Sequence, residues 1–258
     1  MSLNLWLLAA VCLVPLIVRA DELPLEKRVY KDEAGKSIPY RLLKPAKYDA
    51  AQKYPLVLFL HGAGERGTDN EVQLVHGVRA FVERAEKYPC FLIAPQCPND
   101  TKWVDVDWSG DKHVMPETMS DPLRLSLEAL DALQKEFSID RGRIYVTGLS
   151  MGGYGTLDAV FRRPRYFAAA VPICGGGDEA QAKKVAHVPM WFFHGAKDTA
   201  VKPQRSRNMV AALKEAGGKP KYTEYPNEGH GSWVPAYKDN EMFAWLFAQK
   251  LVPEPQAE

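Results

Sequence analysis

Short runs of apolar residues alternate with segments of helical pattern from Tyr54 onward. The run 56–60 is apolar at every position, which is typical of a strand whose two faces are both covered. Alternating strands and helices predict a parallel sheet with helices on both faces, which places the chain in the α/β class. The strands expected on this basis are residues 56–60, 91–95, 143–147, 168–173, 190–194 and 222–225.

The segment before Tyr54 has a different pattern. Residues 26–30 and 37–43 are strand-like and are separated by Asp32-Glu33-Ala34-Gly35, so we expect an antiparallel hairpin at the edge of the sheet. The hairpin brings the sheet to about eight strands. Two helix starts are marked by Pro122 and Pro203, because a proline at the first helical position loses no hydrogen bond.

The first twenty residues differ from the rest of the chain. Residues 5–18 are apolar except at Pro15, and Val18-Arg19-Ala20 precedes the acidic pair Asp21-Glu22. This order is typical of a secretory signal with a small-residue cleavage site. About 14 apolar residues are too few to span a membrane, which takes about 20. We therefore expect a signal peptide over 1–20 and a secreted or periplasmic mature chain without a stable membrane span; an uncleaved anchor is the alternative, because no Lys or Arg precedes the apolar run.

Composition limits the remaining possibilities. Of the 258 residues, 46% are hydrophobic and 25% are charged, and no linker separates two halves, so one large core and a single domain over 21–258 are expected. The chain has 33 Lys and Arg residues against 32 Asp and Glu residues, a net charge of +1. This balance gives no excess of basic residues for binding nucleic acid, and it favours a neutral or small substrate.

Three cysteines follow the predicted signal. Cys90 and Cys97 flank an expected strand and so lie roughly 20 Å apart. A disulfide requires Cα atoms within about 7 Å, so the pair cannot bridge. Together with Cys174 they are expected to be buried reduced thiols, and none has the spacing of zinc ligands.

The pattern Gly148-Leu149-Ser150-Met151-Gly152 carries the strongest chemical signal. A strand precedes it and a helical segment, 154–160, follows it. In a G-x-S-x-G elbow the chain turns so sharply from strand to helix that the serine is strained and its hydroxyl stands clear of the sheet edge. The pattern therefore predicts that Ser150 is a nucleophile.

A serine hydroxyl needs a base and a group that orients the base, and in this topology they follow in the order serine, acid, histidine. Asp198 and His230 satisfy this order. Asp178 is the competing acid, and a turn or helix cap is the alternative role for Asp198. Of the six histidines, only His230 lies C-terminal to the acid; of the others, His76 and His187 are expected in helices, His61 and His194 hold loops at strand ends, and His113 lies in a polar loop.

A tetrahedral intermediate needs donors for its negative charge, and fixed backbone N–H groups serve best. Met151 supplies one because it follows the nucleophile at a helix start. The loop 61–67 follows a strand and supplies the other, from Ala63 or alternatively from Gly64. A phosphate-binding loop is disfavoured, because no Lys-Ser/Thr follows Gly67.

With these residues in place, the expected mature chain resembles the α/β-hydrolase superfamily along its full length. The closer resemblance is to secreted esterases similar to feruloyl and acetylxylan esterases, polyhydroxybutyrate depolymerases and prolyl-oligopeptidase catalytic domains. It rests on the motifs HGAGERG at 61–67, APQCP at 94–98, GLSMGGYG at 148–155 and HGAKD at 194–198. Dienelactone hydrolases share this fold but carry cysteine at the elbow, from which Ser150 departs.

The resemblance implies a secreted serine carboxylesterase that hydrolyses short-chain or aromatic esters, of acetyl or feruloyl type, through an acyl-enzyme and with no cofactor or metal. Only a short segment separates Cys174 from Met190, so no large cap domain is expected. An open site suits small-molecule or polysaccharide-linked esters. A serine peptidase of the prolyl-oligopeptidase type and a non-catalytic binding protein are the alternatives.

Three tryptophans are candidates for contact with the substrate, because an indole combines an apolar face with an N–H donor. Trp103 and Trp108 lie in the long segment 96–120, which is expected to form one wall of the site, and Trp233 follows His230 by three residues. Anchoring of the loops onto the core is the alternative role for each of them.

Overall fold

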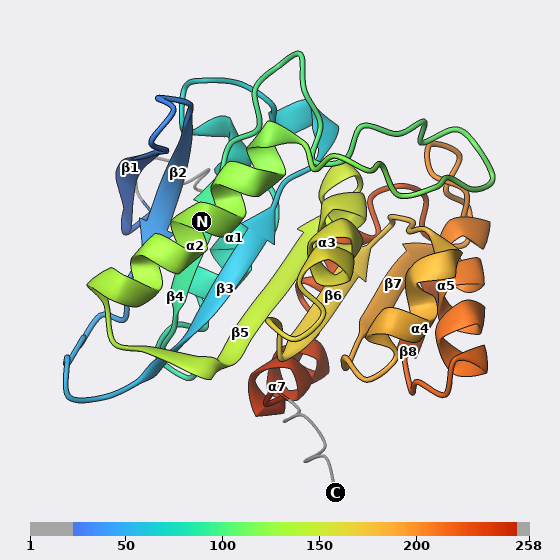
Figure 1. Cartoon of the computed structure of the whole chain (residues 1–258). Coiled ribbons are helices and arrows are strands. Elements are labelled where there is room, and N and C mark those ends of the chain that lie inside the picture. The colour runs from blue at the N-terminus through green and yellow to red at the C-terminus, as the bar shows by residue number, and fades with distance from the viewer. Residues whose placement is uncertain (1–22, 252–258) are drawn as a thin grey trace, which may run out of the picture.

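The computed structural model describes residues 23–251. Its centre is an eight-stranded sheet with the order β1-β2-β4-β3-β5-β6-β7-β8 (Figure 1). Strands β3 to β8 are parallel, and β1 and β2 form an antiparallel hairpin at one edge, as predicted. The strands are β1 (Leu25–Lys31), β2 (Ser37–Leu43), β3 (Tyr54–Leu60), β4 (Phe91–Pro95), β5 (Ile139–Leu149), β6 (Ala169–Ile173), β7 (Trp191–Gly195) and β8 (Lys221–Tyr225).

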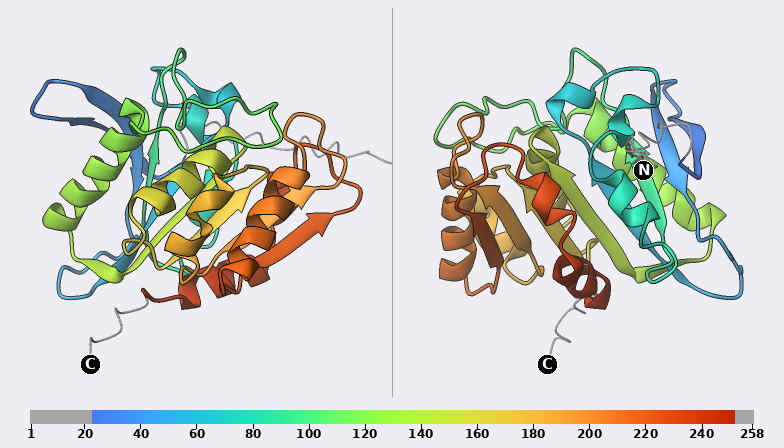
Figure 2. Two further views of the ribbon diagram at one scale, coloured as in Figure 1. Left: turned by 45° about the vertical axis from the view of Figure 1, so that its right-hand side comes forward. Right: turned by 180° about the vertical axis from the view of Figure 1, so that it is seen from behind.

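Helices cover both faces of the sheet, as the alternating pattern predicts. Figure 1 shows one face with α2 (Asp121–Glu136), α3 (Met151–Arg162), α4 (Ala182–Val185) and α5 (Gln204–Glu215) in front of it. The view from behind in Figure 2 shows the other face, which is covered by α1 (Val78–Val82), α6 (Trp233–Ala236) and α7 (Asn240–Ala248).

The two faces have separate cores because successive side chains of a strand point to opposite sides. In β3, Leu58 packs with the core beneath α2 and α3, whereas the next residue, Phe59, packs with the core beneath α1 and α7. Every residue of β3 is buried. Because both faces of the sheet are covered at β3, this strand must be apolar along its whole length.

Both proline-marked helix starts are confirmed. Pro122 lies in the first turn of α2, where the Ser120 hydroxyl accepts a hydrogen bond from the Leu123 N–H at 3.4 Å. Pro203 lies directly before the first residue of α5. These caps fix where the helices begin and therefore where the loops that precede them end.

Only two short elements, η4 (Glu179–Gln181) and α4, separate β6 from β7, so the structure has no large cap domain there, as predicted. Cys90, Cys97 and Cys174 are buried and free. Within residues 23–251, no helix is long and apolar enough to cross a membrane. The predicted signal peptide over 1–20 lies outside the described residues.

Candidate active site

Ser150 is the single residue between the end of β5 and the start of α3, at the carboxyl edge of the parallel strands. Its backbone has φ 55° and ψ −118°, in a region that residues with a side chain rarely adopt. A Cβ on Gly152 would lie 1.9 Å from the Leu60 carbonyl oxygen, and one on Gly148 would lie 2.4 Å from the Gly152 carbonyl oxygen. The strained elbow therefore needs glycine at both positions.

His230 connects Ser150 to Asp198. Its Nε2 lies 2.8 Å from Ser150 Oγ, and its Nδ1 lies 2.7 Å from Asp198 Oδ2. Asp198 follows β7 and His230 follows β8, so three strands of one sheet bring the groups together at one edge. Because the ionised carboxylate accepts a hydrogen bond from Nδ1–H, Nε2 carries no proton and is free to accept the serine proton.

The carboxylate of Asp198 has donors on both oxygens. Oδ1 accepts hydrogen bonds from the N–H groups of Ala200 and Val201, both at 2.9 Å. Burial by itself raises the pKa of Asp198, but the hydrogen bonds from His194, His230 and Val201 outweigh burial and leave this pKa well below its ordinary value. Asp198 therefore stays ionised, as a group that stabilises an imidazolium must. Its turn-capping role and its contact with His230 coexist.

His194, which the sequence predicts to hold a loop at a strand end, is also part of this site. Its side chain is fully buried, and its Nε2 lies 3.2 Å from Asp198 Oδ2 and 3.0 Å from the Val201 carbonyl oxygen. Both neighbours are acceptors, so Nε2 carries the proton. The available signal was the position of His194 four residues before Asp198 in the same strand-end turn.

Asp178, the competing acid, has other partners. Its carboxylate accepts hydrogen bonds from the N–H groups of Met115, at 2.9 Å, and Ala180, at 3.1 Å, and it caps the short helix η4. The structure therefore places Asp198 against His230 and uses Asp178 to fasten the loop before α2.

The two predicted sources of oxyanion donors also meet near Ser150. Met151 begins α3, and the first N–H groups of a helix have no partner within the helix. Ala63 begins the short helix η2 (Ala63–Glu65). A Cβ built on Gly62 would lie 3.6 Å from Ser150 Cβ, so this loop passes directly beside the nucleophile, whereas one on Gly64 would meet nothing within 4 Å.

The expectation that Trp103 contacts the substrate is wrong. Its side chain is fully buried, and its indole N–H donates to the His61 carbonyl oxygen at 2.9 Å. Trp103 thus anchors the segment 96–120 onto the end of β3, which is its alternative predicted role. Trp108 is partly buried, packs against the same core and lies beneath Lys102, whose Nζ is 5.1 Å from the ring centre.

Trp233 lies next to His230. Its ring centre is 5.3 Å from that of His230 and 5.4 Å from that of His76. His76 lies in a turn between η3 (Val72–Leu74) and α1, and His187 lies in the turn after α4, so the prediction that both are helical is wrong. The structure therefore adds His76 to the surroundings of the site.

The segment 96–120 crosses the carboxyl edge of the sheet above α3 and reaches toward α5 (Figure 1). Arg205 of α5 holds it. The guanidinium is fully buried and donates to the carbonyl oxygens of Gly110, at 3.2 Å, and Gly177, at 3.3 Å, and to Nδ1 of His113. Burial and the neighbouring Arg205 charge lower the pKa of His113 to about 4, so this histidine is neutral near pH 7.

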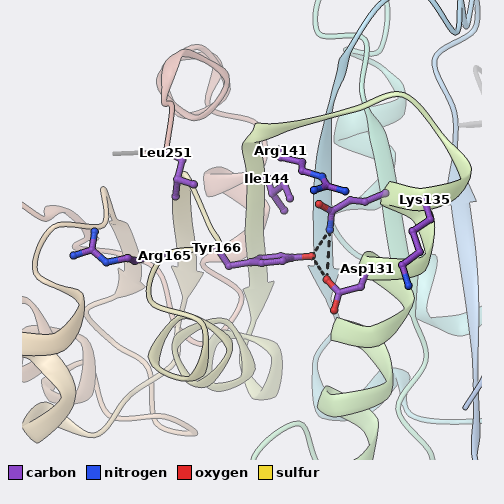
Figure 3. A pocket seen from close by; sticks show the side chains of 8 residues that line it. Asp131, Lys135, Arg141, Ile144, Arg165, Tyr166 and Leu251 are labelled. Atoms are coloured by element: carbon purple, nitrogen blue, oxygen red, sulfur yellow. Dashed lines mark hydrogen bonds between the residues drawn. The ribbon is translucent and has the colours of Figure 1, made fainter. Parts of the chain in front are cut away.

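A pocket of about 370 Å³ lies at the opposite edge of the sheet, near the start of β5 (Figure 3). Its wall includes Tyr166, whose hydroxyl hydrogen-bonds Asp131 and Gln134. Arg165 points away from this group in Figure 3. Since Ser150 lies at the other end of β5, this pocket has no part in the chemistry of the serine.

Cys174 is the remaining side chain with a ligand atom close to the site. Its sulfur and the ligand atoms of Asp198 and His230 lie within 4.8 Å of one another. Burial raises the pKa of the Cys174 thiol, which opposes the thiolate that a metal would bind. The carboxylate and imidazole already bond to each other. These residues are therefore a poor fit for a metal ion.

An eight-stranded, mostly parallel sheet with a strained serine, a histidine and an aspartate at its carboxyl edge defines a serine hydrolase of the α/β-hydrolase fold. The comparison with known families agrees. A model described as the prolyl oligopeptidase family matches residues 121–179 and 178–250, together half of the chain. The chain belongs to this family, and the resemblance predicted from its motifs is confirmed.

Individual relatives carry esterase names. A protein titled as a thermostable esterase, of known crystal structure, is 42% identical with a TM-score of 0.81, over 88% of this chain and 63% of that one. A bifunctional acetylxylan esterase/xylanase from Neocallimastix patriciarum is 23% identical over 77% of this chain. A probable carboxylesterase from Oryza sativa subsp. japonica is 25% identical, over 72% of this chain and 75% of the relative. The chain spans only 27% of the length of the Neocallimastix protein.

Proposed function

We propose that this protein is a secreted carboxylesterase that hydrolyses short-chain or aromatic esters by way of a covalent acyl-enzyme. The observation that carries the proposal is the pair of contacts from His230, 2.8 Å to Ser150 Oγ and 2.7 Å to Asp198 Oδ2. Distances of this size are within the reach that proton transfer requires. The esterase names of several relatives support the same activity.

In the first half of the reaction, Ser150 Oγ attacks the ester carbonyl carbon while His230 Nε2 takes the serine proton. The carbonyl oxygen becomes an oxyanion, which accepts hydrogen bonds from the N–H groups of Met151 and Ala63, with Gly64 as the alternative to Ala63. The carbon–oxygen bond to the alcohol then breaks, and His230 gives its proton to the leaving oxygen. Asp198 stabilises the imidazolium that exists between these two transfers.

In the second half, water attacks the acyl group on Ser150. His230 takes a proton from the water and returns it to Ser150 Oγ, which releases the carboxylic acid and restores the enzyme. This sequence is complete with the side chains named and needs no metal or organic cofactor.

The absence of a large insertion between β6 and β7 supports substrates with small acyl groups. Many lipases place a cap domain there, and without one no apolar cover for a long acyl chain is present at that position. We therefore infer acetyl or aromatic acyl groups carried on a small molecule or a polysaccharide. Turnover should be fastest on p-nitrophenyl acetate and aryl esters and should fall steeply toward p-nitrophenyl octanoate.

The sequence of residues 1–20 supports export. The apolar run 5–18, followed by a small-residue cleavage site, is the feature on which this part of the proposal depends. Expression with the natural N-terminus in a secreting host tests it. A mature chain that begins near Asp21 in the periplasm or medium is the expected result, and retention of the first twenty residues contradicts it.

Replacement of Ser150 by alanine tests the activity. Ser150→Ala should abolish turnover of p-nitrophenyl acetate and labelling by a fluorophosphonate, while circular dichroism stays unchanged. Ser109→Ala, in the exposed part of the segment 96–120, is the matched control and should retain both. Turnover by Ser150→Ala close to that of the wild type, or an adduct located elsewhere by mass spectrometry, would refute the assignment.

The family name favours a second candidate, a serine peptidase. A panel of peptidyl p-nitroanilides and aryl esters with the same acyl group separates the two candidates. The esterase proposal predicts that the aryl esters react far faster. A protein that folds, keeps Ser150 and reacts with neither substrate nor fluorophosphonate would instead be a non-catalytic binding protein on the same scaffold.

A further inference from the structure

The carboxylate of Glu65 is buried beside the nucleophile without a complete set of partners. Glu65 is 8% exposed, and its Oε2 has no hydrogen-bond partner. A Cβ built on Gly62 would lie 2.9 Å from this oxygen and 3.6 Å from Ser150 Cβ, so both groups border the same small space. A buried acceptor without a donor is costly, and such a group calls for a reason.

The carboxylate is part of a cluster that continues to His230. Oε1 of Glu65 lies 3.8 Å from Nε2 of His76, the His76 ring packs on Trp233, and Trp233 packs edge-to-face on His230. The indole N–H of Trp233 is also buried and without an acceptor. The cluster beside Ser150 and His230 therefore contains one acceptor without a donor, Glu65 Oε2, and one donor without an acceptor, Trp233 Nε1.

The loop 61–67 is also held by contacts that do not involve the Glu65 side chain. The neighbouring Arg66 donates from Nε to the Ala63 carbonyl oxygen at 2.9 Å and from Nη1 to the Thr101 carbonyl oxygen at 3.4 Å. These bonds fasten the loop to itself and to the segment 96–120. None of these bonds satisfies the buried oxygen of Glu65, which has no partner within the described residues.

The chemistry of the cluster selects one class of ligand. A hydroxyl both donates and accepts, so neighbouring hydroxyl groups can satisfy Glu65 Oε2 and Trp233 Nε1 together. An ammonium satisfies the carboxylate but offers no lone pair to the indole, and an anionic group is repelled by Glu65. The rings of Trp233 and His76 add apolar surface to the cluster, and aromatic surface of this kind packs on sugars.

The place of the cluster indicates which part of the ester it contacts. The oxygen of the leaving alcohol must come within hydrogen-bond reach of His230 Nε2 to receive its proton. The ring of Trp233 packs edge-to-face on that imidazole, so Trp233 is a near neighbour of the group that gives up this proton. We propose that Glu65, His76 and Trp233 bind the alcohol part of the ester and that this alcohol is a sugar with free hydroxyls beside the acylated position.

This inference rests on the proposed esterase activity and is tested with two esters that share one acyl group. p-Nitrophenyl acetate has a leaving group without hydroxyls, and acetylated xylo-oligosaccharide has a leaving group rich in them. Glu65→Gln keeps the shape of the side chain and removes its charge, and Trp233→Phe keeps a ring and removes the N–H donor. Glu33→Gln, at an exposed position in the hairpin turn, is the control and should change neither rate.

For Glu65→Gln, kcat/KM on the sugar ester should fall about tenfold more than on p-nitrophenyl acetate, as expected when a charged acceptor is replaced by a neutral one. Trp233→Phe should show the same order of sensitivity between the two esters. Xylotriose binding to the Ser150→Ala protein, measured by calorimetry, should weaken when Glu65→Gln is added. This second measurement does not depend on turnover.

Equal losses on the two esters would overturn the inference, because a merely structural role affects both. A larger loss on an aminoacyl p-nitrophenyl ester than on the sugar ester would overturn it in favour of a cationic ligand. A wild-type protein that hydrolyses p-nitrophenyl acetate but not the sugar ester would remove this inference and leave the esterase proposal standing. A wild-type protein that hydrolyses no ester removes both.

Discussion

His194 and Asp198 form a buried pair in which the imidazole Nε2 lies 3.2 Å from carboxylate Oδ2. The same oxygen faces His230 Nδ1 at 2.7 Å, so two histidines share one carboxylate oxygen. The His194 imidazole is fully buried, whereas 28% of the His230 side chain is exposed to solvent. The buried His194 therefore helps to keep the Asp198 carboxylate ionised and in place for His230.

Replacement of His194 tests this positioning role. His194→Ala removes one donor to an ionised carboxylate, an interaction of about 1.5–3 kcal/mol, so kcat should fall roughly tenfold to a hundredfold with little change in KM. His194→Gln, which offers an amide N–H, should restore part of the loss. The pH profile of kcat should also shift, because the pKa of Asp198 rises when a donor is lost.

His187→Ala is the control, because His187 contacts the Pro164 carbonyl oxygen far from the serine. It should leave kcat and its pH profile unchanged. An unchanged kcat in His194→Ala with an intact fold would show that His194 only fills space.

The choice between the two candidate acids is tested by a matched pair of amides. Asp198→Asn should reduce turnover of p-nitrophenyl acetate by about 10³ to 10⁴, because an amide cannot hold His230 in the tautomer that accepts the serine proton. Asp178→Asn keeps a side chain that can still cap η4 and should retain most of the activity. The opposite ranking of the two variants would transfer the role of the acid to Asp178.

His61 makes stability depend on pH. Its Nδ1 donates to the Gly62 carbonyl oxygen and its Nε2 accepts from the Cys97 N–H, so the ring is neutral, and burial lowers its pKa to about 4. Between this value and the unfolded pKa of about 6.5, the unfolded chain binds the proton and the folded chain does not. Stability is therefore complete above about pH 6.5 and falls as pH decreases to 4, by on the order of 3 kcal/mol from this group.

Thermal unfolding at pH 7.5 and pH 4.5 checks this expectation. His61→Gln keeps an acceptor for the Cys97 N–H and cannot be protonated, so its melting temperature should start lower but change less between the two pH values. If the variant and the wild type lose the same amount of stability, other groups are responsible for the dependence.

Arg205 is expected to hold the segment 96–120 closed. Arg205→Met removes the donors to Gly110 and Gly177, so trypsin should cut at Lys102 and Lys112 several times faster than in the wild type. Arg207→Met is the control on the same helix, since Arg207 is exposed and pairs with Glu224. Equal cleavage in the two variants would show that the segment is fastened elsewhere.

The features that could be predicted from the sequence are those with a local signature. The composition of an apolar strand such as 56–60 is enough to indicate that both of its faces are buried. The glycines beside Ser150 indicate a turn that only small residues allow. Asp198 and His230 follow from chain order, because the topology of the sheet fixes which strand ends meet. For these residues, local pattern and global fold agree.

The remaining features depend on contacts between distant segments. Trp103 lies in a polar loop, and only its fit against the end of β3 buries it completely. His76 has a helical neighbourhood in the sequence, but it lies in a turn and packs on Trp233, more than 150 positions later in the chain. Neither segment alone has a sequence pattern that indicates such a pairing, because the contact exists only in the folded chain.

The close approach of Gly152 to Leu60 has a consequence for how fast the protein works. The turn that carries Ser150 packs against the end of β3, which leads into the loop 61–67. Neither segment therefore has room to move relative to the other. We therefore expect that no opening and closing motion at this point limits the rate of the catalytic cycle. Turnover should accordingly be insensitive to added viscogen and should instead follow the intrinsic reactivity of the acyl group.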